Sequence, residues 1–554
     1  MLSQFLLAVL LFGAAYLPAQ SVDTLLLSVD TTLEISALTV KAKPIEYGEL
    51  ATAELSQMDV YLDPAAKADP LLAVQALPAA TTEAETANIS LRGSIVGATG
   101  VYLNGVPLRS AVRIDQTNGL GQFSIFGQLP LEGITVYAAA PPVGFSQAAA
   151  GAVVVETAAD RPERPLTSLS LHLAGGGASH RRTVGERGSL TAYANVGTLA
   201  PFRFLNGRRI EAVQRSRSVD GMLSYRHELG KGGSVQLTYL GFRESYKYEH
   251  TMEDGSPLNI EQEKDRHLAV VNYRQLLNKD WTLAVDYGGD YHRPDFRVGD
   301  DQYAFRRDAQ YGATYVERRV TGSTLRVGVA ANQYASETTP RQLYEPYAQA
   351  QFRLHPKLLA GGGTKLVHGT YDGTTRLTTQ ASLRYQLTDR QRLYLSGGRF
   401  HQYLPPDRNL EDWSWFESRQ LALEYAYEGD RWSGGGAGFL KTDVLAGHPT
   451  RLNGGELWGR FQAGGFDARL AANTFGQLRG RLRYEFGLGW TTGLAYTAWQ
   501  QTERDYHRVD VSLNKLFLVG DRVLIVYATI NNLADRDNVG FSRRLVFFGG
   551  VLQY

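Results

Sequence analysis

A polar segment that contains Pro405 and Pro406 is flanked by five side chains that could hold a ligand: His401, Tyr403, Trp413, Trp415 and Phe416. Aromatic rings offer large flat surfaces that can stack on a sugar, a peptide or a metal chelate. The same side chains could instead pack one loop against another, or sit at a membrane interface, where Tyr and Trp are enriched. These residues are therefore candidate ligand contacts, and a purely structural role stays open.

The residue types that catalysis and metal binding require are missing or scattered. The chain has no cysteine, which excludes thiol catalysis and cysteine-based metal sites. Its 11 histidines do not fall at metal-ligand spacings, so we expect no protein-bound metal. No nucleophile elbow, phosphate-binding loop or zinc-protease helix occurs. We expect a protein that is not an enzyme, with no catalytic residues and no cofactor.

The first residues indicate export, and the charge argues against nucleic acid. Phe5–Tyr16 is an uncharged apolar run, and Leu17, Pro18 and Ala19 offer a small-residue cleavage site, so we predict a signal peptide over residues 1–19. A short buried helix is the alternative. No later stretch reaches the ~18 apolar residues of a spanning helix. A formal net charge of +1 gives no reason to expect a nucleic-acid partner.

Alternation with period two dominates the chain beyond residue 165. In 481–490, RLRYEFGLGW, apolar and aromatic residues alternate with charged residues and glycines. In a soluble sheet the apolar row would be buried in a core, whereas in a membrane barrel it faces lipid and the charged row faces a wet lumen. The same alternation recurs at 281–288, 382–387 and 421–428. Aromatic residues near the ends of these rows favour the membrane barrel.

Short turns separate these segments, at 230–233, 278–280, 321–322, 355–356, 388–390, 429–430 and 520–521. Longer polar segments, such as 248–265 and 404–416, lie between them. At roughly 18–20 residues per strand and connection, the chain after residue 165 would form about 20–22 strands, with 22 favoured. We therefore predict a mainly β protein: a large antiparallel transmembrane β-barrel with a small N-terminal α+β plug domain inside the lumen.

The last strand must close such a barrel against the first. Phe548, Leu552 and Tyr554 share one face of the terminal segment, and the final residue is aromatic. An open strand edge would be a liability, so we expect this segment to pair with the first strand of the barrel. The alternative is a terminus that is merely hydrophobic.

The segment before the barrel carries a series of motifs in order: Asp69-Pro70, Leu77-Pro78, Leu91-Arg92-Gly93, Asn104-Gly105-Val106-Pro107, Ile134–Tyr137 and Gly144–Val155. In this order they resemble the plug of TonB-dependent outer-membrane receptors. Segments 410–443 and 514–541 are similar to strand pairs of the same family. Two positions depart from the family pattern, since Asn104 replaces an acidic residue and Gly144–Gln147 replaces a Tyr-Gly-Gly stretch.

The resemblance implies a domain order and roles for several residues. Residues 20–60 would be a periplasmic leader, 61–160 the plug and 161–554 the barrel, with a Pro-rich charged linker at 160–165. Arg92 would pair with inward carboxylates and seat the plug, because a buried charge must be paired. The seating residues would be Arg92, Gly93, Asn104, Gly105, Pro107 and Gly151. Asn104-Gly105 suits a hairpin turn, and Gly151 would let a plug strand lie close to the wall.

The resemblance also implies import of a scarce nutrient across the outer membrane of a Gram-negative bacterium: a siderophore or other metal chelate, an oligosaccharide or a peptide. The partners would be outer-membrane lipid and a periplasmic TonB-type energy transducer. Residues 33–40 would be the energy-coupling segment, which pairs with that partner as an added strand through Leu33, Glu34, Ile35, Leu38 and Val40. A flexible leader is the alternative for this segment.

The loops are short for a receptor of this kind, and this leaves two other hypotheses. The first is a plugged barrel that serves as a structural or docking component of a surface uptake or secretion complex, in which a surface lipoprotein captures the substrate. The second is a passive porin, which the plug motifs disfavour.

Overall fold

The structure is a computed structural model that describes residues 51–81, 85–115, 120–127, 129–207, 213–251, 255–320, 322–335, 340–405, 413–500, 505–520, 522–536, 538 and 543–554. Residues 42–554 belong to one compact unit. The predicted signal peptide 1–19, the energy-coupling segment 33–40 and most of the leader 20–60 lie outside the described residues.

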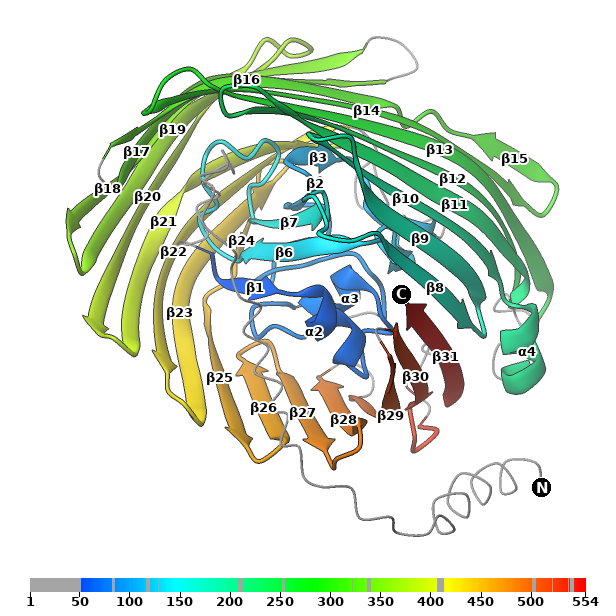
Figure 1. Cartoon of the computed structure of the whole chain (residues 1–554). Helices are drawn as coiled ribbons and strands as arrows, with labels where there is room; N and C mark the ends of the chain where they lie inside the picture. Colours follow the sequence, from blue (N-terminus) through cyan, green and yellow to red (C-terminus); the bar gives the residue numbers. More distant parts are fainter. Residues whose placement is uncertain are drawn as a thin grey trace. The chain divides into compact units, whose positions relative to one another are not determined.

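A closed antiparallel β-barrel makes up most of the chain (Figure 1). Its strands are β8 (Leu166–His172), β9 (Gly175–Val184), β10 (Gly188–Thr198), β11 (Val213–Leu229), β12 (Gly233–Thr251), β13 (Pro257–Leu276), β14 (Trp281–Val298), β15 (Asp301–Ala304), β16 (Ala309–Val320), β17 (Ser323–Tyr334), β18 (Arg341–His355), β19 (Leu358–Gly369), β20 (Thr375–Thr388), β21 (Gln391–Leu404), β22 (Ser414–Glu428), β23 (Trp432–Leu445), β24 (His448–Arg451), β25 (Gly454–Ala463), β26 (Phe466–Asn473), β27 (Gln477–Glu485), β28 (Trp490–Trp499), β29 (Tyr506–Val519), β30 (Arg522–Asn531) and β31 (Leu545–Gln553). The short helix α4 (Ala200–Asn206) lies between β10 and β11.

Two of these strands are extensions of the wall rather than members of the ring. β14 pairs directly with β16, and β23 pairs directly with β25, so that β15 and β24 are bypassed. The ring therefore has 22 strands, the number favoured from the sequence. The ring closes where β31 pairs with β8, from Gly549 opposite His172 to Gln553 opposite Ser168. The prediction that the terminal segment closes the barrel is confirmed.

The alternating rows are arranged as in a membrane barrel. In β27, the side chains of Leu482 and Tyr484 are 39% and 43% exposed on the outside. Arg481, between them in sequence, points inward and pairs with Asp63 of the plug. The apolar row faces outward because a strand directs successive side chains to opposite faces.

One part of the strand prediction is wrong. The segment 481–490 is not a single strand, because β27 ends at Glu485 and the next strand begins at Trp490. Gly487, Leu488 and Gly489 have φ angles of +88°, +50° and +74°, which belong to a turn. The period-two pattern runs through the turn because glycines occupy every second position there, as small inward residues would in a strand.

The two ends of the barrel differ in their connections. The turns predicted from the sequence all join strands at one end, called here the short-turn rim; Thr321 and Asp521, in two of them, lie outside the described residues. The opposite end, the long-loop rim, carries β15, β24 and α4. The wall is also uneven: β11–β14 have 17 to 20 residues, whereas β8, β26, β27 and β31 have 7 to 9. Figure 1 shows the long strands in green, opposite the short strands in orange and red.

The plug lies inside the ring of strands (Figure 1, blue to cyan). Its elements are β1 (Ala53–Leu55), α2 (Gln57–Leu62), α3 (Pro70–Val74), β2 (Thr99–Leu103), β3 (Val106–Leu108), β4 (Val112–Asp115), β5 (Gly121–Ser124), β6 (Leu131–Tyr137) and β7 (Gly151–Thr157). Five strands form a sheet in the order β1-β6-β7-β2-β3, and β4 and β5 form a separate hairpin. Because β1 pairs with β6, the plug sheet extends upstream of the boundary predicted at residue 61.

Local sequence explains several plug elements. The Asp69-Pro70 motif begins helix α3: one oxygen of Asp69 accepts from the backbone N–H groups of Leu71 and Leu72, at 2.9 and 3.2 Å, and Pro70 suits the first turn. The other oxygen accepts from the backbone of Ser124 at 2.6 Å and so ties α3 to β5. β7 reads GAVVVET without alternation because both of its faces are buried.

No helix within the described ranges is long and apolar enough to cross a membrane.

Candidate ligand cavity and plug contacts

A cavity of about 910 Å³ lies at the long-loop rim, between the plug and the barrel wall. The plug contributes the connection between β3 and β4, with Arg109 and Ser110, and the segment 96–97. The barrel contributes the connections that follow β15, β17, β19 and β21. A ligand that entered here would therefore rest on the plug, which lies beneath this cavity.

The lining of this cavity is rich in arginine. It includes Arg109, Arg306, Arg307 and Arg341, with Asp290 as the only carboxylate among the described lining residues. Asp290 is held by the buried Arg266, whose Nε and Nη2 donate to its two oxygens at 2.9 and 2.6 Å. The cavity therefore has an excess of positive charge and favours an anion.

Arg109 is the arginine that the plug presents to the cavity. Its guanidinium lies 5.2 Å from the ring centroid of Trp413, a cation–π contact, and its Nη1 has no hydrogen-bond partner. Burial lowers the pKa of Arg109 to about 10, and the nearby Arg307 lowers it further in the same direction. A guanidinium in these surroundings would gain from a carboxylate, phenolate or phosphate placed beside it.

Aromatic rings complete the lining, and two of the five predicted ligand contacts are among them. Trp413 lies 5.0 Å from Tyr334 and 5.3 Å from Tyr403 between ring centroids, and the second pair is stacked. Trp415 is behind this group, 5.1 Å from Tyr403, and its indole N–H donates to Asp372 at 2.5 Å. Tyr403 and Trp413 line the cavity, whereas Trp415 supports them from outside it.

The other two predicted contacts are buried away from the cavity. His401 is hydrogen-bonded to Thr378, and its Nε2 lies 3.4 Å from Glu417. Phe416 packs with Phe400 and Leu404 against alanines of the plug. Proximity in sequence could not separate these residues from Tyr403 and Trp413, because that depends on which side of the strand ends the plug occupies.

Sequence reasoning missed the arginines of the cavity. Phe305, Arg306 and Arg307 form an aromatic and basic run in a connection at the long-loop rim, and this run was a usable signal. Arg109 follows the Asn104–Pro107 motif directly and could have been found in the same way. Arg341 begins a strand, and nothing in its neighbourhood in the sequence marks it out.

A second group of contacts joins the plug to the wall through Arg92. Its Nη2 lies 2.7 Å from Glu424 and 2.7 Å from Glu456, and the side chain is almost fully buried. Burial alone would lower the pKa of Arg92, but the two barrel carboxylates outweigh burial and raise it. Next to it, Ser94 donates to Asp443 of the barrel at 2.5 Å. The structure thus places Arg92 between the inward carboxylates with which it was predicted to pair.

The other predicted seating residues have different surroundings. Gly93 has φ +78°, and a Cβ there would lie 2.6 Å from the ring of Phe475 in the barrel. Asn104 and Gly105, with φ +49° and +82°, form the turn between β2 and β3, and the carbonyl of Asn104 accepts from Asn272 of the barrel at 2.9 Å. Pro107 lies in β3, opposite Tyr102 of the plug.

The reason given for Gly151 is wrong. Its φ of +152° does favour glycine, but a Cβ at this position would meet Leu91 and the carbonyl of Tyr137, each at 2.7 Å. Both belong to the plug, so the close approach is inside the plug and not between the plug and the barrel wall. The sequence showed a glycine before a buried strand, and it could not show which surface that strand approaches.

A further plug arginine, Arg113 in β4, was not found from the sequence. Its Nε lies 2.6 Å from Glu244 and its Nη2 2.9 Å from Asp220, two carboxylates of the barrel. As at Arg92, burial would lower the pKa of Arg113, and the carboxylates outweigh burial and raise it. Arg92 and Arg113 are therefore equivalent contacts with well-separated strands of the wall, β22 and β25 for Arg92, and β11 and β12 for Arg113.

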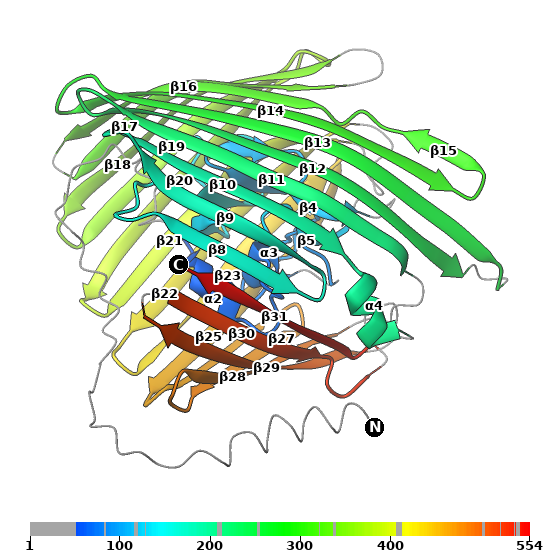
Figure 2. The ribbon, with the colours of Figure 1, turned by 45° about the vertical axis from the view of Figure 1, so that its right-hand side comes forward.

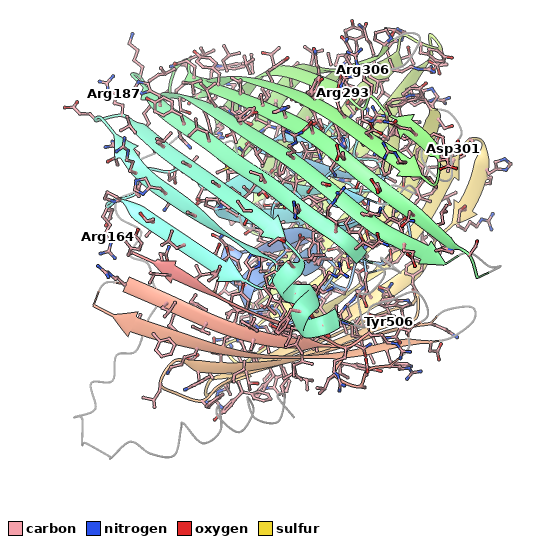
Figure 3. All side chains as sticks on the ribbon, turned by 90° about the vertical axis from the view of Figure 1, so that its right-hand side faces the viewer. Arg164, Arg187, Arg293, Asp301, Arg306 and Tyr506 are labelled. Atoms are coloured by element: carbon pink, nitrogen blue, oxygen red, sulfur yellow. The ribbon has the colours of Figure 1, made fainter. Side chains whose placement is uncertain are left out.

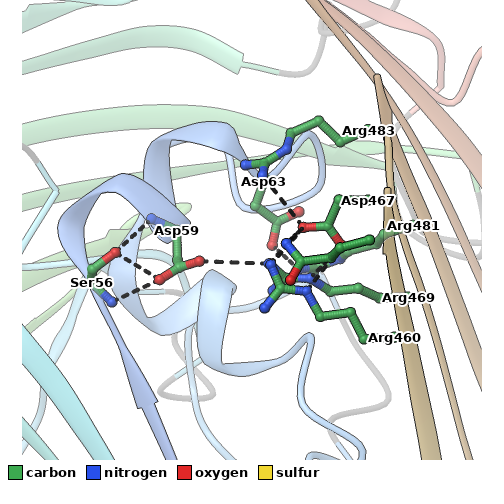
Figure 4. A network of polar contacts seen from close by, with 9 residues as sticks. Ser56, Asp59, Asp63, Arg460, Asp467, Arg469, Arg481 and Arg483 are labelled. Atoms are coloured by element: carbon green, nitrogen blue, oxygen red, sulfur yellow. Dashed lines mark hydrogen bonds and ion pairs between the residues drawn. The ribbon is translucent and has the colours of Figure 1, made fainter. Parts of the chain in front are cut away.

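At the short-turn rim, helix α2 of the plug faces a cluster of barrel arginines (Figure 4). Asp63 pairs with Arg481 at 2.5 Å, and Asp59 lies 3.8 Å from Arg469. Burial raises the pKa of Asp63, even though Arg481 acts in the opposite direction. Within the wall, Asp467 serves three further contacts, to Arg460, Arg469 and Arg483.

Comparison with solved structures places the fold. The ferric enterobactin receptor PfeA of Pseudomonas aeruginosa, in a mutant form, matches with a TM-score of 0.68 and 13% identity over 92% of this chain and 99% of that one. The siderophore receptor PirA of Acinetobacter baumannii gives 0.71 and 11% over 93% and 99%. The hemophore receptor HasR of Serratia marcescens, solved with its hemophore HasA and heme, gives 0.70 and 14% over 91% and 98%.

These structural neighbours are TonB-dependent siderophore and heme receptors, and this chain has their fold, a 22-strand barrel around a plug. The resemblance found in the sequence is confirmed at that level. No protein-family model and no curated protein sequence matches the chain. The fold is one of transport receptors rather than enzymes. Among the described residues, no group of three or more histidines and carboxylates could hold a metal ion.

Proposed function

We propose that this protein is an outer-membrane receptor that imports a scarce, negatively charged nutrient through its plugged barrel. The observation that carries the proposal is the cavity at the long-loop rim, which is rich in arginine, lined by aromatic rings and bounded below by the plug. Of the ligand classes expected from the sequence, it favours anionic members: a metal chelate, an acidic oligosaccharide or an acidic peptide. The printed names of the structural neighbours support a ferric siderophore.

The cavity suggests a role for each kind of side chain. Arg109, Arg307 and Arg341 would neutralise the ligand, and a guanidinium fork suits paired oxygens such as those of a carboxylate or catecholate. Tyr403 and Trp413 would stack on flat parts of the ligand. Because Arg109 belongs to the plug, a ligand bound to it would contact both the plug and the wall.

Import would require energy because the plug fills the bore. We propose that residues 33–40 pair with a periplasmic TonB-type transducer, through Leu33, Glu34, Ile35, Leu38 and Val40. The transducer would act on the plug from the short-turn rim, where β1 and α2 are the first described elements. Arg92, Gly93, Asn104, Gly105 and Pro107 would seat the plug until then.

The test uses a ferric tris-catecholate labelled with radioactive iron, with a neutral oligosaccharide as the control ligand. Cells that carry the protein should bind the chelate at the surface and accumulate it only with a proton-motive force. Deletion of residues 33–40 should abolish accumulation and leave surface binding unchanged. Accumulation that survives the deletion would refute the energy-coupling assignment. Equal binding of the neutral oligosaccharide would refute the anionic ligand.

A second candidate is a docking component that works with a surface lipoprotein. One feature favours it: the connection between β8 and β9 has two residues and that between β26 and β27 has three, so one side of the long-loop rim is low and open to a partner. Purified protein that binds the chelate without any partner would argue for the receptor. A chelate bound only after a lipoprotein is added would argue for the docking component.

A further inference from the structure

Helix α4 covers an open strand edge at the seam where the barrel closes. β31 pairs with β8 only from Gly549 to Gln553, so its residues 545–548 extend beyond the end of β8. Asn206, the last residue of α4, is 2% exposed. Its side-chain amide donates to the carbonyl of Val546 at 2.9 Å, and its carbonyl oxygen accepts from the N–H of Val546 at 2.8 Å. Asn206 thus pairs with β31 as a residue of a neighbouring strand would.

The two faces of α4 differ sharply. Phe202 and Asn206, one turn apart, face β31, where Phe202 contacts Phe547 with ring centroids 6.3 Å apart. Phe204 and Leu205 point the other way and are 90% and 43% exposed. Figures 2 and 3 both show the helix on the outside of the ring of strands. The contacts of the inner face therefore fix a large aromatic side chain outside the wall.

The wall beneath α4 is the lowest part of the barrel. With seven residues at roughly 3.3 Å each, β8 is about 23 Å long before any tilt, whereas the apolar band of outer-membrane barrels is about 25 Å tall. The outer surface of β8 is nonetheless apolar, and Leu171 near its end is 75% exposed. A wall shorter than the membrane is a hydrophobic mismatch, which exposes acyl chains to polar groups or thins the bilayer.

We propose that α4 is an interfacial helix that places Phe204 and Leu205 in the lipid of the outer leaflet and so extends the apolar wall above β8. The occupant of this face is lipid, because Phe204 and Leu205 continue the apolar surface of Leu171 in the direction in which β8 is too short. An amphipathic helix that lies in the plane of the interface meets lipid in this way. This role is independent of the ligand and of energy coupling.

Site-directed fluorescence can test this proposal because the chain has no cysteine of its own. The variants are Phe204→Cys, Leu171→Cys as the control within the apolar belt and Tyr303→Cys as the control at the long-loop rim. Each is labelled with an environment-sensitive fluorophore in the full-length protein, in phospholipid vesicles. Quenching is then measured with nitroxide groups attached to lipid chains and with aqueous iodide. Leu205→Cys provides a second position if Phe204→Cys does not fold.

Lipid-bound nitroxide should quench the label at Phe204 about as strongly as the label at Leu171, and iodide should quench only the label at Tyr303. Quenching by iodide at Phe204 to the extent seen at Tyr303 would overturn the proposal, because the helix would then face water. A label that neither quencher reaches would also overturn it, since this face would then be covered by protein, such as a second copy of the chain.

Discussion

Arginines gather on both sides of the plug, and the two groups differ in their partners. In the cavity at the long-loop rim, the one lining carboxylate is Asp290, and Arg266 occupies both of its oxygens. Arg109 meets an aromatic ring there and no carboxylate. The cavity thus presents cationic groups whose counter-charge is not supplied by the chain.

At the short-turn rim, by contrast, the chain supplies the counter-charges. Arg481 pairs with Asp63, and Arg469 lies between Asp467 and Asp59. The same pattern holds deeper in the bore, where Arg92 sits between two glutamates. The comparison teaches that arginine content alone does not mark a ligand site. A site is indicated where buried or half-buried arginines lack a carboxylate from the same chain.

The largest effect is expected at the paired end of this comparison. Arg92→Ala leaves Glu424 and Glu456 facing each other without a cation, and breaking a buried ion pair costs about 3–5 kcal/mol. Hydrogen exchange followed by mass spectrometry should show plug peptides losing protection at lower urea concentrations than in the parent protein. The triple variant with Glu424→Gln and Glu456→Gln should recover part of the loss. Unchanged protection in Arg92→Ala would contradict a seating role.

At the unpaired end, Arg109→Ala should weaken binding of an anionic ligand without weakening the plug. A hydrogen bond to a charged group contributes about 1.5–3 kcal/mol, which corresponds to a loss in affinity of roughly 10- to 150-fold. Titration of the ferric tris-catecholate against purified protein measures this directly. Arg306→Ala is the matched control, because Arg306 pairs with Asp308 and is mostly exposed. A loss of plug protection in Arg109→Ala would place this arginine with the structural group.

A smaller effect, dependent on pH, is expected at Asp63. Its pKa is raised in the folded protein by burial, so the protonated form is favoured and the stability it contributes is present at low pH and lost as pH rises through the folded pKa. Relative to Asp63→Asn, the parent protein should therefore be more stable at pH 4 than at pH 7. Urea unfolding at both values, followed by plug hydrogen exchange, measures the difference. A difference that grows as pH rises would mean that Arg481 dominates over burial.

The smallest effect is expected at Asp59. It lies 3.8 Å from Arg469, and the two side chains are 37% and 35% exposed, so the pair is screened by solvent. Asp59→Asn should lower the stability of the plug by less than about 1 kcal/mol. The same urea series measures it, with Asp63→Asn as the internal comparison. A loss as large as that of Arg92→Ala would show that α2 is held mainly by this exposed pair.

Much of the fold could be predicted from the chain alone. Period-two alternation, short turns at regular intervals and an aromatic terminus identified the antiparallel barrel and its closure, because each depends on residues close together in sequence. The pattern failed in 486–490, where glycines of a turn occupy the positions that small inward residues take in a strand. The three-residue strand β1 was too short to show any period.

The candidate site was less predictable. Tyr403 and Trp413 line the cavity, whereas His401 and Phe416, a few residues away, are buried beside it. Arg92 was found because its motif lies in a recognisable order, but Arg113, which has the same kind of contacts, has no such motif. Contacts between plug and wall join residues more than a hundred positions apart, and no local pattern encodes them.

The sequence by itself determined that strands alternate, where they turn and that no thiol chemistry occurs, since these properties follow from residue type and spacing. The tertiary structure alone decided which arginines receive a carboxylate. It also decided which aromatic rings line a cavity and where a short helix must replace a missing strand. The physical reason is that charge pairing, enclosure and edge coverage depend on how the plug and the 22 strands meet in space.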